Sequence, residues 1–296
     1  MDLNVTERAP LPFRLGKFMI RTGVPGGHRT LVVARRLGLL GRVVDYTLLD
    51  GYRLGVPIGR SENDWDRRDL LAYEHHLVSS IVDATSDLSG PTALVDCGAD
   101  IGTISVLLAM RTGKLAKVFA VEPNEAVWKV LRHNVSRLPM PGEAIPAAIA
   151  DFAGRGRFGA PDHDRSSDHA RFLVPDPDGP ISVMRIDDLP LQGFENVVLK
   201  IDVEGGEAAA IAGAARTIAR TEAVVVAFEA HPEQIKRTGI DPTSILKALN
   251  AIRPCDARVC EAASARIDLD RPFFDQFGRD QIYNLVCRSA ASKTQS

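Results

Sequence analysis

The chain has 296 residues, of which 45% are hydrophobic and 25% charged, with a formal net charge of -2 at pH 7. This is the composition of an ordinary globular protein, long enough for one large α/β domain or two small ones. The near-neutral balance argues against a nucleic-acid-binding protein, and no run approaches the ~18 apolar residues of a membrane span. The first residues also lack the apolar segment of a signal peptide, so we expect a cytoplasmic protein.

The charge is unevenly distributed along the chain. Residues 1–42 contain eight Lys or Arg against Asp2 and Glu7, so this segment is strongly basic and the remainder is acidic. A basic segment of this kind either meets an anionic substrate or a membrane surface, or neutralises an acidic core. We favour the second interpretation and keep peripheral membrane contact as the alternative.

The N-terminal segment, residues 1–61, is expected to be an extension of the main domain. Residues 1–27 are rich in Pro, Gly and Arg and predict an irregular arm. Residues 28–43 predict a short amphipathic helix. Two β-like runs within 43–59 flank Asp50-Gly51, a dipeptide typical of a β-hairpin turn.

Residues 62–290 predict an α/β domain. Residues 62–84 have helical periodicity, and strands alternate with helices after Ser89-Gly90-Pro91. We expect strands at 92–97, 117–122, 144–149, 196–202, 222–229 and 280–288, and helices at 102–111, 124–137, 206–219 and 242–252. The continuous apolar runs 197–199 and 223–228 are typical of strands buried on both faces, which predicts a mostly parallel sheet between helices. The polar segment 150–195 interrupts this alternation, and we expect it to be a long insert that contains short strands.

A glycine-containing loop follows the first of these strands. Residues 93–105 read ALVDCGADIGTIS, so a strand ends in Asp96 and passes through Gly98 and Gly102 into a helix. Glycine permits a tight turn and a close ligand approach, and the helix start offers free N–H groups. The next strand ends in Glu122, whose carboxylate can accept hydrogen bonds from two ribose hydroxyls. The pattern predicts a nucleotide-type cofactor site.

The spacing and charge of the loop favour one cofactor class. The glycines are four residues apart, which is not G-x-G-x-x-G, and no G-K-[ST] follows. Asp96 and Asp100 both lie in the loop, and two carboxylates repel phosphates but suit a cationic or hydroxylated ligand. S-adenosylmethionine, with its sulfonium, amino group and ribose, fits that pattern.

Two further acidic groups follow later strands. In LKIDVEGGE, residues 199–207, Lys200, Asp202 and Glu204 lie at period two and so share one side of the chain. They either satisfy one another and the loop amides, or face cofactor and substrate, and we favour the second. Glu207 is explained by its place in the first turn of the next helix.

In FEAHPE, residues 228–233, Glu229 and His231 end another strand at the same edge. Histidine is the natural general base near neutral pH, although a hydrogen-bonded loop histidine is the alternative. Asp202, Glu229 and His231 could together bind a divalent metal, but without a denser cluster we predict no metal site.

These blocks, in order, resemble the FkbM family of S-adenosylmethionine-dependent methyltransferases. The resemblance covers roughly 62–288 and rests on VDCGADIGTIS, VFAVEPNEAVWKVLRHNV, AAIAD, RIDDL, LKIDVEGGEAAAIAGA and a strand ending in EAHPE. LKIDVEG-x-E is the most distinctive of these motifs. Where the family loop usually reads G-A-N-I-G, this chain has Asp100 in place of the Asn.

The resemblance implies a fold and a set of site residues. The fold is the class I methyltransferase (Rossmann-like) sheet of seven strands, the last one antiparallel. The glycine loop and Glu122 then line the cofactor, and the AAIAD block flanks its adenine. The implied cofactor-binding residues are Asp96, Gly98, Ala99, Asp100, Gly102, Glu122, Pro123, Ala148, Ile149 and Asp151.

The resulting prediction is an S-adenosylmethionine-dependent O-methyltransferase. By resemblance, its acceptor is a hydroxyl of a glycan, a glycolipid or a secondary metabolite. The candidate catalytic residues are Asp202, Glu204, Glu229 and His231, with His231 or Glu204 as base and Asp202 orienting that base or the methionine amino group. The alternatives are a non-catalytic S-adenosylmethionine-binding module and, disfavoured by the loop spacing, an NAD-dependent oxidoreductase.

Overall fold

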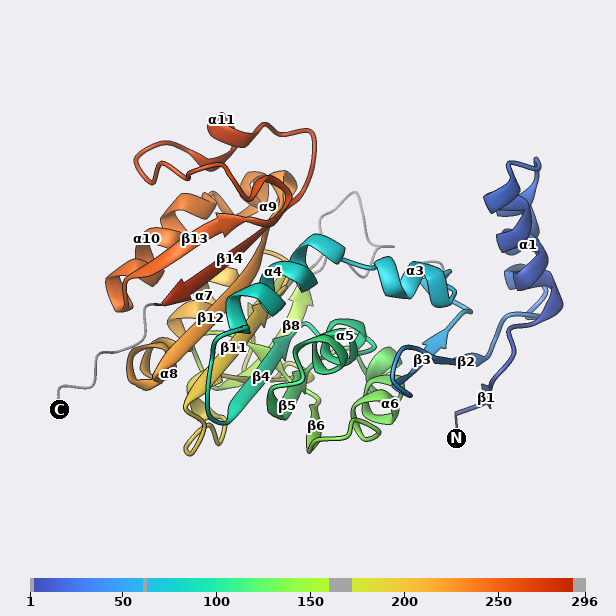
Figure 1. Ribbon diagram of the computed structural model, residues 1–296, viewed down its shortest axis with the longest axis horizontal. Coiled ribbons are helices and arrows are strands. Elements are labelled where there is room, and N and C mark those ends of the chain that lie inside the picture. The colour runs from blue at the N-terminus through green and yellow to red at the C-terminus, as the bar shows by residue number, and fades with distance from the viewer. Residues whose placement is uncertain (1–2, 61–62, 160–171, 290–296) are drawn as a thin grey trace.

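The structure is a computed structural model that describes residues 3–60, 63–159 and 172–289 (Figure 1). At its centre is a seven-stranded sheet in the order β13-β14-β12-β11-β4-β5-β6. Its strands are β4 (Thr92–Cys97), β5 (Leu115–Val121), β6 (Gly142–Ile145), β11 (Asn196–Ile201), β12 (Ala223–Ala230), β13 (Cys255–Val259) and β14 (Tyr283–Ser289). Six of these strands run in the same direction, and β14 runs opposite to them. The predicted class I methyltransferase sheet, with its last strand antiparallel, is confirmed.

Helices cover both faces of this sheet. One face packs against α4 (His75–Thr85), α5 (Thr103–Thr112) and α6 (Glu125–Val135), and the other against α7 (Glu207–Ala212), α8 (Ala215–Arg220) and α10 (Pro242–Ile252). Every residue of β4 and β11 is buried, as expected for central strands enclosed between two helix layers. Burial on both faces fixes the strand ends, and therefore the loops that carry the candidate site.

Two helices expected from the sequence are each divided into two helices in the structure. The helix expected at 206–219 is two helices, α7 and α8, because the chain bends at Gly213, where an added Cβ would lie 2.1 Å from the Ala150 carbonyl oxygen. The helix expected at 62–84 is likewise α3 (Arg67–Ala72) and α4. Glu74 separates them with a left-handed φ of 45°, which ends one helix and starts the next.

The strand expected at 144–149 is also divided. Residues 142–145 form β6 of the main sheet, whereas β7 (Ala148–Ile149) begins a second, four-stranded sheet. That sheet has the order β7-β10-β8-β9 and includes β8 (Gly154–Gly159), β9 (Phe172–Pro175) and β10 (Ile181–Met184). The described part of the 150–195 insert therefore forms the short strands that were predicted, and residues 160–171 lie outside the described chain.

The N-terminal extension contains a small sheet and a pair of helices. Strands β1 (Val5–Thr6), β2 (Val43–Thr47) and β3 (Arg53–Pro57) pair in chain order. The hairpin predicted at Asp50-Gly51 is confirmed, with both residues at positive φ. Gly55 N donates to Asn134 Oδ1 at 2.7 Å, and Asn134 Nδ2 donates to the Ile101 carbonyl at 2.8 Å. Asn134 thus joins the extension to the glycine loop.

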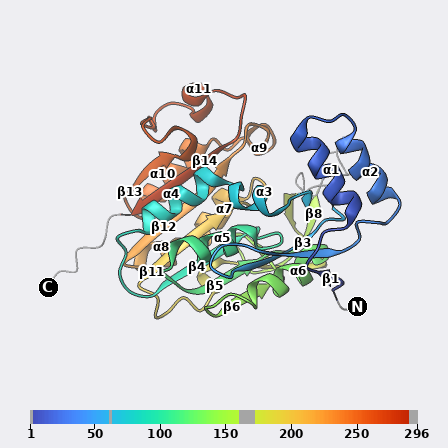
Figure 2. The same cartoon turned by 45° about the vertical axis from the view of Figure 1, so that its right-hand side comes forward.

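The irregular arm predicted for residues 1–27 is wrong in its second half, which forms α1 (Leu11–Thr22) packed on α2 (Gly27–Arg36) (Figure 2). Pro12 is tolerated because it lies in the first turn of α1. Gly16 packs directly on α2, since an added Cβ there would lie 2.6 Å from the Leu31 side chain. Proline and glycine therefore permit this helix pair rather than prevent it.

Two short helices were not predicted, α9 (Pro232–Thr238) and α11 (Phe273–Phe277), nor was strand β13. Each is a short element at the edge of the main sheet, where the sequence carries little periodicity. None of the helices in the described ranges is both long and apolar enough to cross a membrane.

Candidate functional site

The carboxyl ends of β4, β5, β11 and β12 open into a cavity of about 730 Å³. This volume is in the range of small-molecule sites, and the location is where ligands bind in open α/β sheets. Aromatic side chains from outside the main sheet complete its walls, namely Trp65, Tyr73, Phe152, Phe158 and Phe172.

The loop after β4 is held against two neighbouring strands. Gly98 has a φ of 73°, and an added Cβ would lie 1.8 Å from the Asp202 carbonyl oxygen. Gly98 N and Ala99 N both donate to the Val121 carbonyl, at 2.9 and 3.1 Å. Only glycine can occupy this left-handed position so close to another backbone. Gly98 and Ala99 both line the cavity.

Glu122 lies at the end of β5 and lines the same cavity. Its Oε2 accepts from Asp100 N at 2.9 Å, and its Oε1 accepts from Asn124 N at 2.8 Å. Each oxygen keeps a further lone pair for a ligand hydroxyl. Burial raises the pKa of Glu122 to about 7 and outweighs the two amide hydrogen bonds, which lower it.

Asp100 is held by a residue that the sequence did not single out. Its φ of 46° is left-handed, which Asp tolerates better than most residues. Its Oδ1 pairs with Arg60 Nη1 at 2.8 Å, and both residues line the cavity. The charge that Asp100 adds to the loop is therefore balanced by an arginine of the N-terminal extension.

Asp96 and Gly102 were expected to bind the cofactor, and the structure places both behind the glycine loop. Asp96 is 0% exposed, and its Oδ2 accepts from Ser105 Oγ at 2.7 Å behind the glycine loop. Gly102 caps α5, where an added Cβ would lie 2.9 Å from a Leu131 methyl group. Both residues shape the loop from behind and are absent from the cavity wall.

The residues expected to flank the adenine form one side of the cavity. Pro123, Ala148, Ile149 and Asp151 all line it. Ala148 and Ile149 are held by parallel pairing of β7 with β10, so the second sheet positions this wall.

Lys200 is a buried cation that lines the cavity between the glycine loop and the acidic loop after β11. Its Nζ donates to the Gly98 carbonyl at 3.0 Å and lies 3.4 Å from both Asp96 Oδ1 and Asp202 Oδ2. Burial alone would lower the pKa of Lys200, but the carboxylates of Asp96 and Asp202 outweigh it and raise the pKa. A charged ammonium therefore joins the strand ends of β4 and β11.

Further carboxyl groups line the cavity. Asp202, Glu204, Glu229 and Glu74 all line the cavity. Burial, reinforced by the negative charges of Asp202 and Glu204, raises the pKa of Glu229 to about 9. Burial also raises the pKa of Glu74, although its Oε2 accepts from Asn284 Nδ2 at 3.1 Å. The cavity thus has an acidic end with a strong affinity for protons or for a cation.

The loop after β11 has a strained, fixed conformation. Glu204 is left-handed with a φ of 56°, and its carbonyl accepts from Arg237 Nη2 on α9. Glu207 Oε1 accepts from Val203 N and Gly205 N, at 3.3 and 3.1 Å. Glu207 was predicted to stabilise the helix start. It lies there, and it also holds the loop that presents Glu204.

His231 does not lie with these carboxyl groups. It caps α9, where its Nδ1 accepts from Glu233 N at 3.1 Å, and it is not part of the cavity wall. This corrects the expectation that His231 faces the substrate, because the strand β12 ends at Ala230 and the chain turns into α9. The alternative, a hydrogen-bonded loop histidine, describes its geometry.

Several cavity residues escaped the sequence reasoning. Tyr73 and Trp65 line it with ring centroids 4.7 Å apart. Asn284 donates a hydrogen bond to Glu74 although the two residues are 210 positions apart in the sequence, so no local motif could predict this pair. Glu74, directly after Tyr73, interrupts the helix with its left-handed backbone. The hydrophobic pattern around it stays helical, so the sequence does not indicate this interruption. No group of three or more His, Cys, Asp or Glu in the described ranges is arranged to hold a metal ion.

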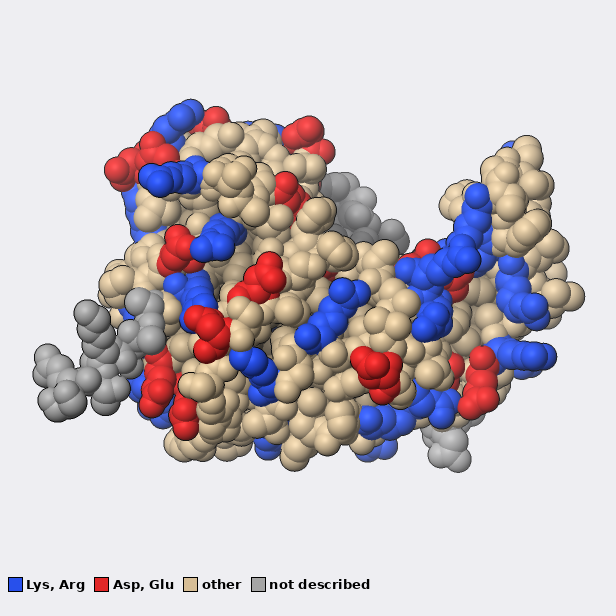
Figure 3. All heavy atoms as spheres, in the orientation of Figure 1, with Lys and Arg blue, Asp and Glu red and all other residues tan. Residues whose placement is uncertain are grey.

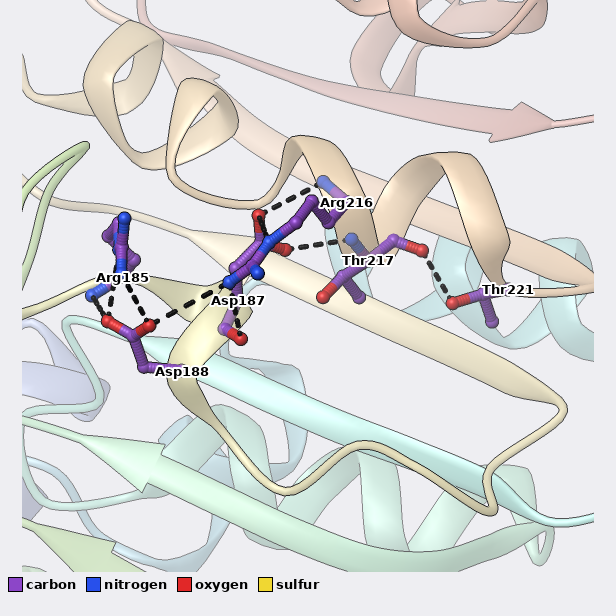
Figure 4. A network of polar contacts seen from close by, with 6 residues as sticks. All are labelled: Arg185, Asp187, Asp188, Arg216, Thr217 and Thr221. Atoms are coloured by element: carbon purple, nitrogen blue, oxygen red, sulfur yellow. Dashed lines mark hydrogen bonds and ion pairs between the residues drawn. The ribbon is translucent and has the colours of Figure 1, made fainter.

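The RIDDL motif lies outside the cavity and forms a polar network (Figure 4). Asp187 accepts from the Arg216 and Thr217 amides at the start of α8, at 3.0 and 2.8 Å. Although burial opposes them, these hydrogen bonds lower the pKa of Asp187. Arg185 pairs with Asp188 at 2.9 Å. The motif therefore fastens the end of β10, which pairs with β7 of the cavity wall, to α8.

Comparison with known proteins agrees with this architecture. The family model described as the methyltransferase FkbM domain matches residues 96–259. The hexuronic acid methyltransferase AglP of Haloferax volcanii is 24% identical over 204 residues, covering 68% of this chain and 78% of that protein.

Two solved structures are also similar to this chain over part of its length. A methyltransferase FkbM from Methylobacillus flagellatus is 19% identical with a TM-score of 0.43, and the match covers 73% of this chain but only 50% of that one. A precorrin-6y C5,15-methyltransferase from Geobacter metallireducens is 14% identical with a TM-score of 0.39, over 75% of this chain and 91% of that one. Because the family model matches more than half of the chain, this protein belongs to the FkbM methyltransferase domain family.

Proposed function

We propose that this methyltransferase uses S-adenosylmethionine and transfers the methyl group to a hydroxyl of a glycan, a glycolipid or a secondary metabolite. The observation that carries the proposal is the division of one cavity into two chemically different ends. Glu122 and the glycine loop line one part of the cavity, and the carboxyl groups that follow β11 and β12 line another. Lys200 lies between the two, since its Nζ contacts both the Gly98 carbonyl and Asp202 Oδ2. A ligand that is both hydroxylated and cationic satisfies the two ends together.

The residues present fit this cofactor. Both Glu122 oxygens can each accept a ribose hydroxyl beside the amide that they already hold. The adenine would lie against Pro123, Ala148 and Ile149, which present small apolar surfaces. The sulfonium and the amino group would face the acidic end, where Asp202 and Glu229 favour positive charge.

The bound cofactor supplies an electrophilic methyl group, and the chain must align an acceptor hydroxyl with it. We assign the role of base to Glu229, in place of His231, because Glu229 lines the cavity and His231 does not. With a pKa of about 9 the carboxyl group holds a proton in the free protein. A cation beside it lowers that pKa and leaves a carboxylate that can accept the hydroxyl proton.

The other carboxyl groups position this base and the ligand. Asp202 is held by Lys200, so its charge has a fixed place next to the cofactor end. Glu204 stands in a loop fixed by Glu207 and Arg237 and would contact the acceptor. Rigid placement of this kind lowers the entropy cost of aligning two reactants.

The hexuronic acid methyltransferase of Haloferax volcanii supports a sugar-containing acceptor, since its name places it on a sugar acid. The decisive experiment is a methyl-transfer assay with labelled S-adenosylmethionine against extracts of the native host, with the product identified by mass spectrometry. An O-methylated hydroxyl in the product supports the proposal. A methylated nitrogen or carbon, or cofactor binding without any transfer to any fraction, contradicts it.

Calorimetric titration provides a separate test of the cofactor. We expect binding of S-adenosylmethionine and none of NAD, because a diphosphate would meet the acidic end of the cavity. Tight NAD binding would overturn the cofactor assignment whatever the acceptor is.

A further inference from the structure

The helical arm, defined as α1, the turn 23–26 and α2, projects from the rest of the molecule (Figures 1 and 2). Its two helices pack on each other through Phe13, Gly16 and Leu31, which are buried. The side of α1 that faces away from α2 is also apolar. Because α2 covers only one of the two apolar sides of α1, the other side is available to a partner outside the chain.

The outward side of α1 carries large exposed apolar side chains. Leu11, Leu15 and Phe18 follow the spacing i, i+4, i+7 and are 71, 49 and 60% exposed. In the turn at the end of the arm, Val24 is 46% exposed. Isolated exposed apolar residues are common, but a continuous stripe on a projecting element marks an interaction site.

The charge of the arm has a single sign. Between Glu7 and Asp45 the sequence contains eight Lys or Arg and no Asp or Glu. Some of these cations are held by the body, such as Arg35 by Asp64 at 2.6 Å. No carboxylate in the described ranges forms an ion pair with Arg14, Arg29 or Arg36. In Figure 3 the upper part of the arm shows tan and blue spheres but no red ones.

We propose that the arm binds the surface of a lipid bilayer that contains anionic headgroups. Apolar side chains flanked by unpaired arginines are the composition of segments that lie in a membrane interface. There Leu11, Leu15, Phe18 and Val24 enter the acyl boundary while the arginines meet lipid phosphates. A second copy of this chain fits less well, because two arms of like charge repel each other.

The arm is attached beside the cavity. Lys17 Nζ donates to the Asp64 carbonyl at 2.9 Å and pairs with Asp69 Oδ2 at 2.7 Å. Trp65, the residue after Asp64, lines the cavity. A bilayer that holds the arm therefore also fixes the orientation of the cavity relative to the membrane.

The test is co-sedimentation of the full chain with vesicles of phosphatidylcholine, with and without phosphatidylglycerol. We expect binding only to the anionic vesicles, weakened by salt. Arg14→Ser, Arg29→Ser and Arg36→Ser together should weaken it by about fivefold for each arginine. A matched control, Lys247→Ser, Arg258→Ser and Arg279→Ser, removes the same charge from exposed positions far from the arm and should bind as the wild type does.

A second pair of variants separates apolar insertion from simple charge attraction. Leu15→Ser with Phe18→Ser should reduce vesicle binding by at least tenfold, since each side chain loses its apolar burial. The control, Ile240→Ser with Ile282→Ser, removes two other exposed apolar residues and should change nothing. Both positions on the arm are exposed, so the thermal unfolding midpoint should stay unchanged.

Absence of wild-type binding to anionic vesicles overturns the proposal. So does a wild-type dimer in sedimentation velocity that Leu15→Ser with Phe18→Ser converts to a monomer while vesicle binding persists, because the stripe would then serve self-association. Equal losses in the arm and control variants would also overturn it. Cofactor affinity, measured in parallel, reports on the cavity and is expected to be the same in all these variants.

Discussion

The two ends of the cavity are built in opposite ways. At the glycine-loop end, Gly98, Ala99 and Glu122 are held by backbone amides and carbonyls within two neighbouring strand-to-helix loops. At the acidic end, side chains from distant segments meet, such as Glu74 and Asn284, and the pKa of Glu229 rises to about 9 because of burial and neighbouring charge. The glycine-loop end depends on backbone geometry, whereas the acidic end depends on coupled side-chain charges. The following changes test this difference.

The largest effect on turnover is expected from Glu229→Gln, which keeps the shape and removes the base. Loss of a general base slows a reaction by about 10²–10⁴-fold. Initial rates at saturating cofactor measure this, while the affinity for S-adenosylmethionine stays within a few-fold of the wild type. Full turnover in a folded Glu229→Gln protein would remove Glu229 from the mechanism and leave alignment as the source of the rate.

Lys200→Met should cause the largest loss of stability. It leaves the buried carboxylate of Asp96 and the partly exposed carboxylate of Asp202 without their cation. Breaking a buried pair such as that of Lys200 and Asp96 costs about 3–5 kcal/mol. Chemical denaturation measures the loss, and Asp96→Leu added to Lys200→Met should restore much of it. The exposed pair of Lys247 and Asp270 supplies the control, since Lys247→Met should change stability little. A neutral Lys200→Met would show that the ammonium does not hold the strand ends together.

Glu122→Gln tests the other end of the cavity. We expect S-adenosylmethionine and its demethylated product to bind about 10–100-fold more weakly, because charge-assisted hydrogen bonds to the ribose are lost. Calorimetry measures both affinities, and Glu143→Gln on β6, paired with Lys117 outside the cavity, is the control. An equal loss of affinity for both ligands supports a contact of Glu122 with the ribose. A loss of affinity for S-adenosylmethionine alone would contradict that contact.

The raised pKa of Glu229 predicts a pH dependence that reaches higher pH than the one expected from Glu122, whose pKa is raised to about 7. Below about pH 9 the carboxyl group of the free protein keeps its proton, and binding of a cation must release it. The affinity for S-adenosylmethionine should therefore rise with pH, by up to about tenfold per unit. The affinity for the product, which lacks the sulfonium charge, should rise less. The folded state holds a proton that the unfolded chain releases above its ordinary pKa of 4.5, so the cofactor-free protein loses stability as pH rises toward about 9. A constant ratio of the two affinities across pH would contradict this coupling.

His231→Ala should have the smallest effect. Its Nδ1 caps α9, and losing a helix cap costs about 1 kcal/mol. Thermal unfolding should show that small loss while turnover stays within about twofold of the wild type. A large loss of turnover with unchanged stability would return His231 to the reaction.

The glycine-loop end shows which features of the site can be predicted from local sequence. A strand, Gly98 and a second strand ending in Glu122 predict one site because consecutive parallel strands must bring their carboxyl ends together. Nothing in the same motif distinguishes Gly98, which lines the cavity, from Asp96 and Gly102, which lie behind it. That distinction depends on the direction of each side chain after the turn, and therefore on what packs behind it.

The acidic end shows where sequence reasoning fails. Asp202, Glu204 and Glu229 were identified as acids at strand exits, and the structure brings all three into the cavity. His231 was assigned with them because it follows the same strand, but the chain turns into α9 after Ala230. Glu74, Asn284 and Arg60 carry no local signal, because each reaches the cavity from an element far away in the chain.

The sequence by itself determined the alternation of strands and helices, the parallel sheet and the edge at which the site lies, because hydrophobic period and glycine spacing act over a few neighbouring residues. Only the tertiary structure decided which carboxyl groups share the cavity, which are buried enough to hold protons, and that Pro12 and Gly16 belong to a helix in a projecting arm. Those properties depend on burial and on contacts between distant segments, which no short stretch of sequence specifies.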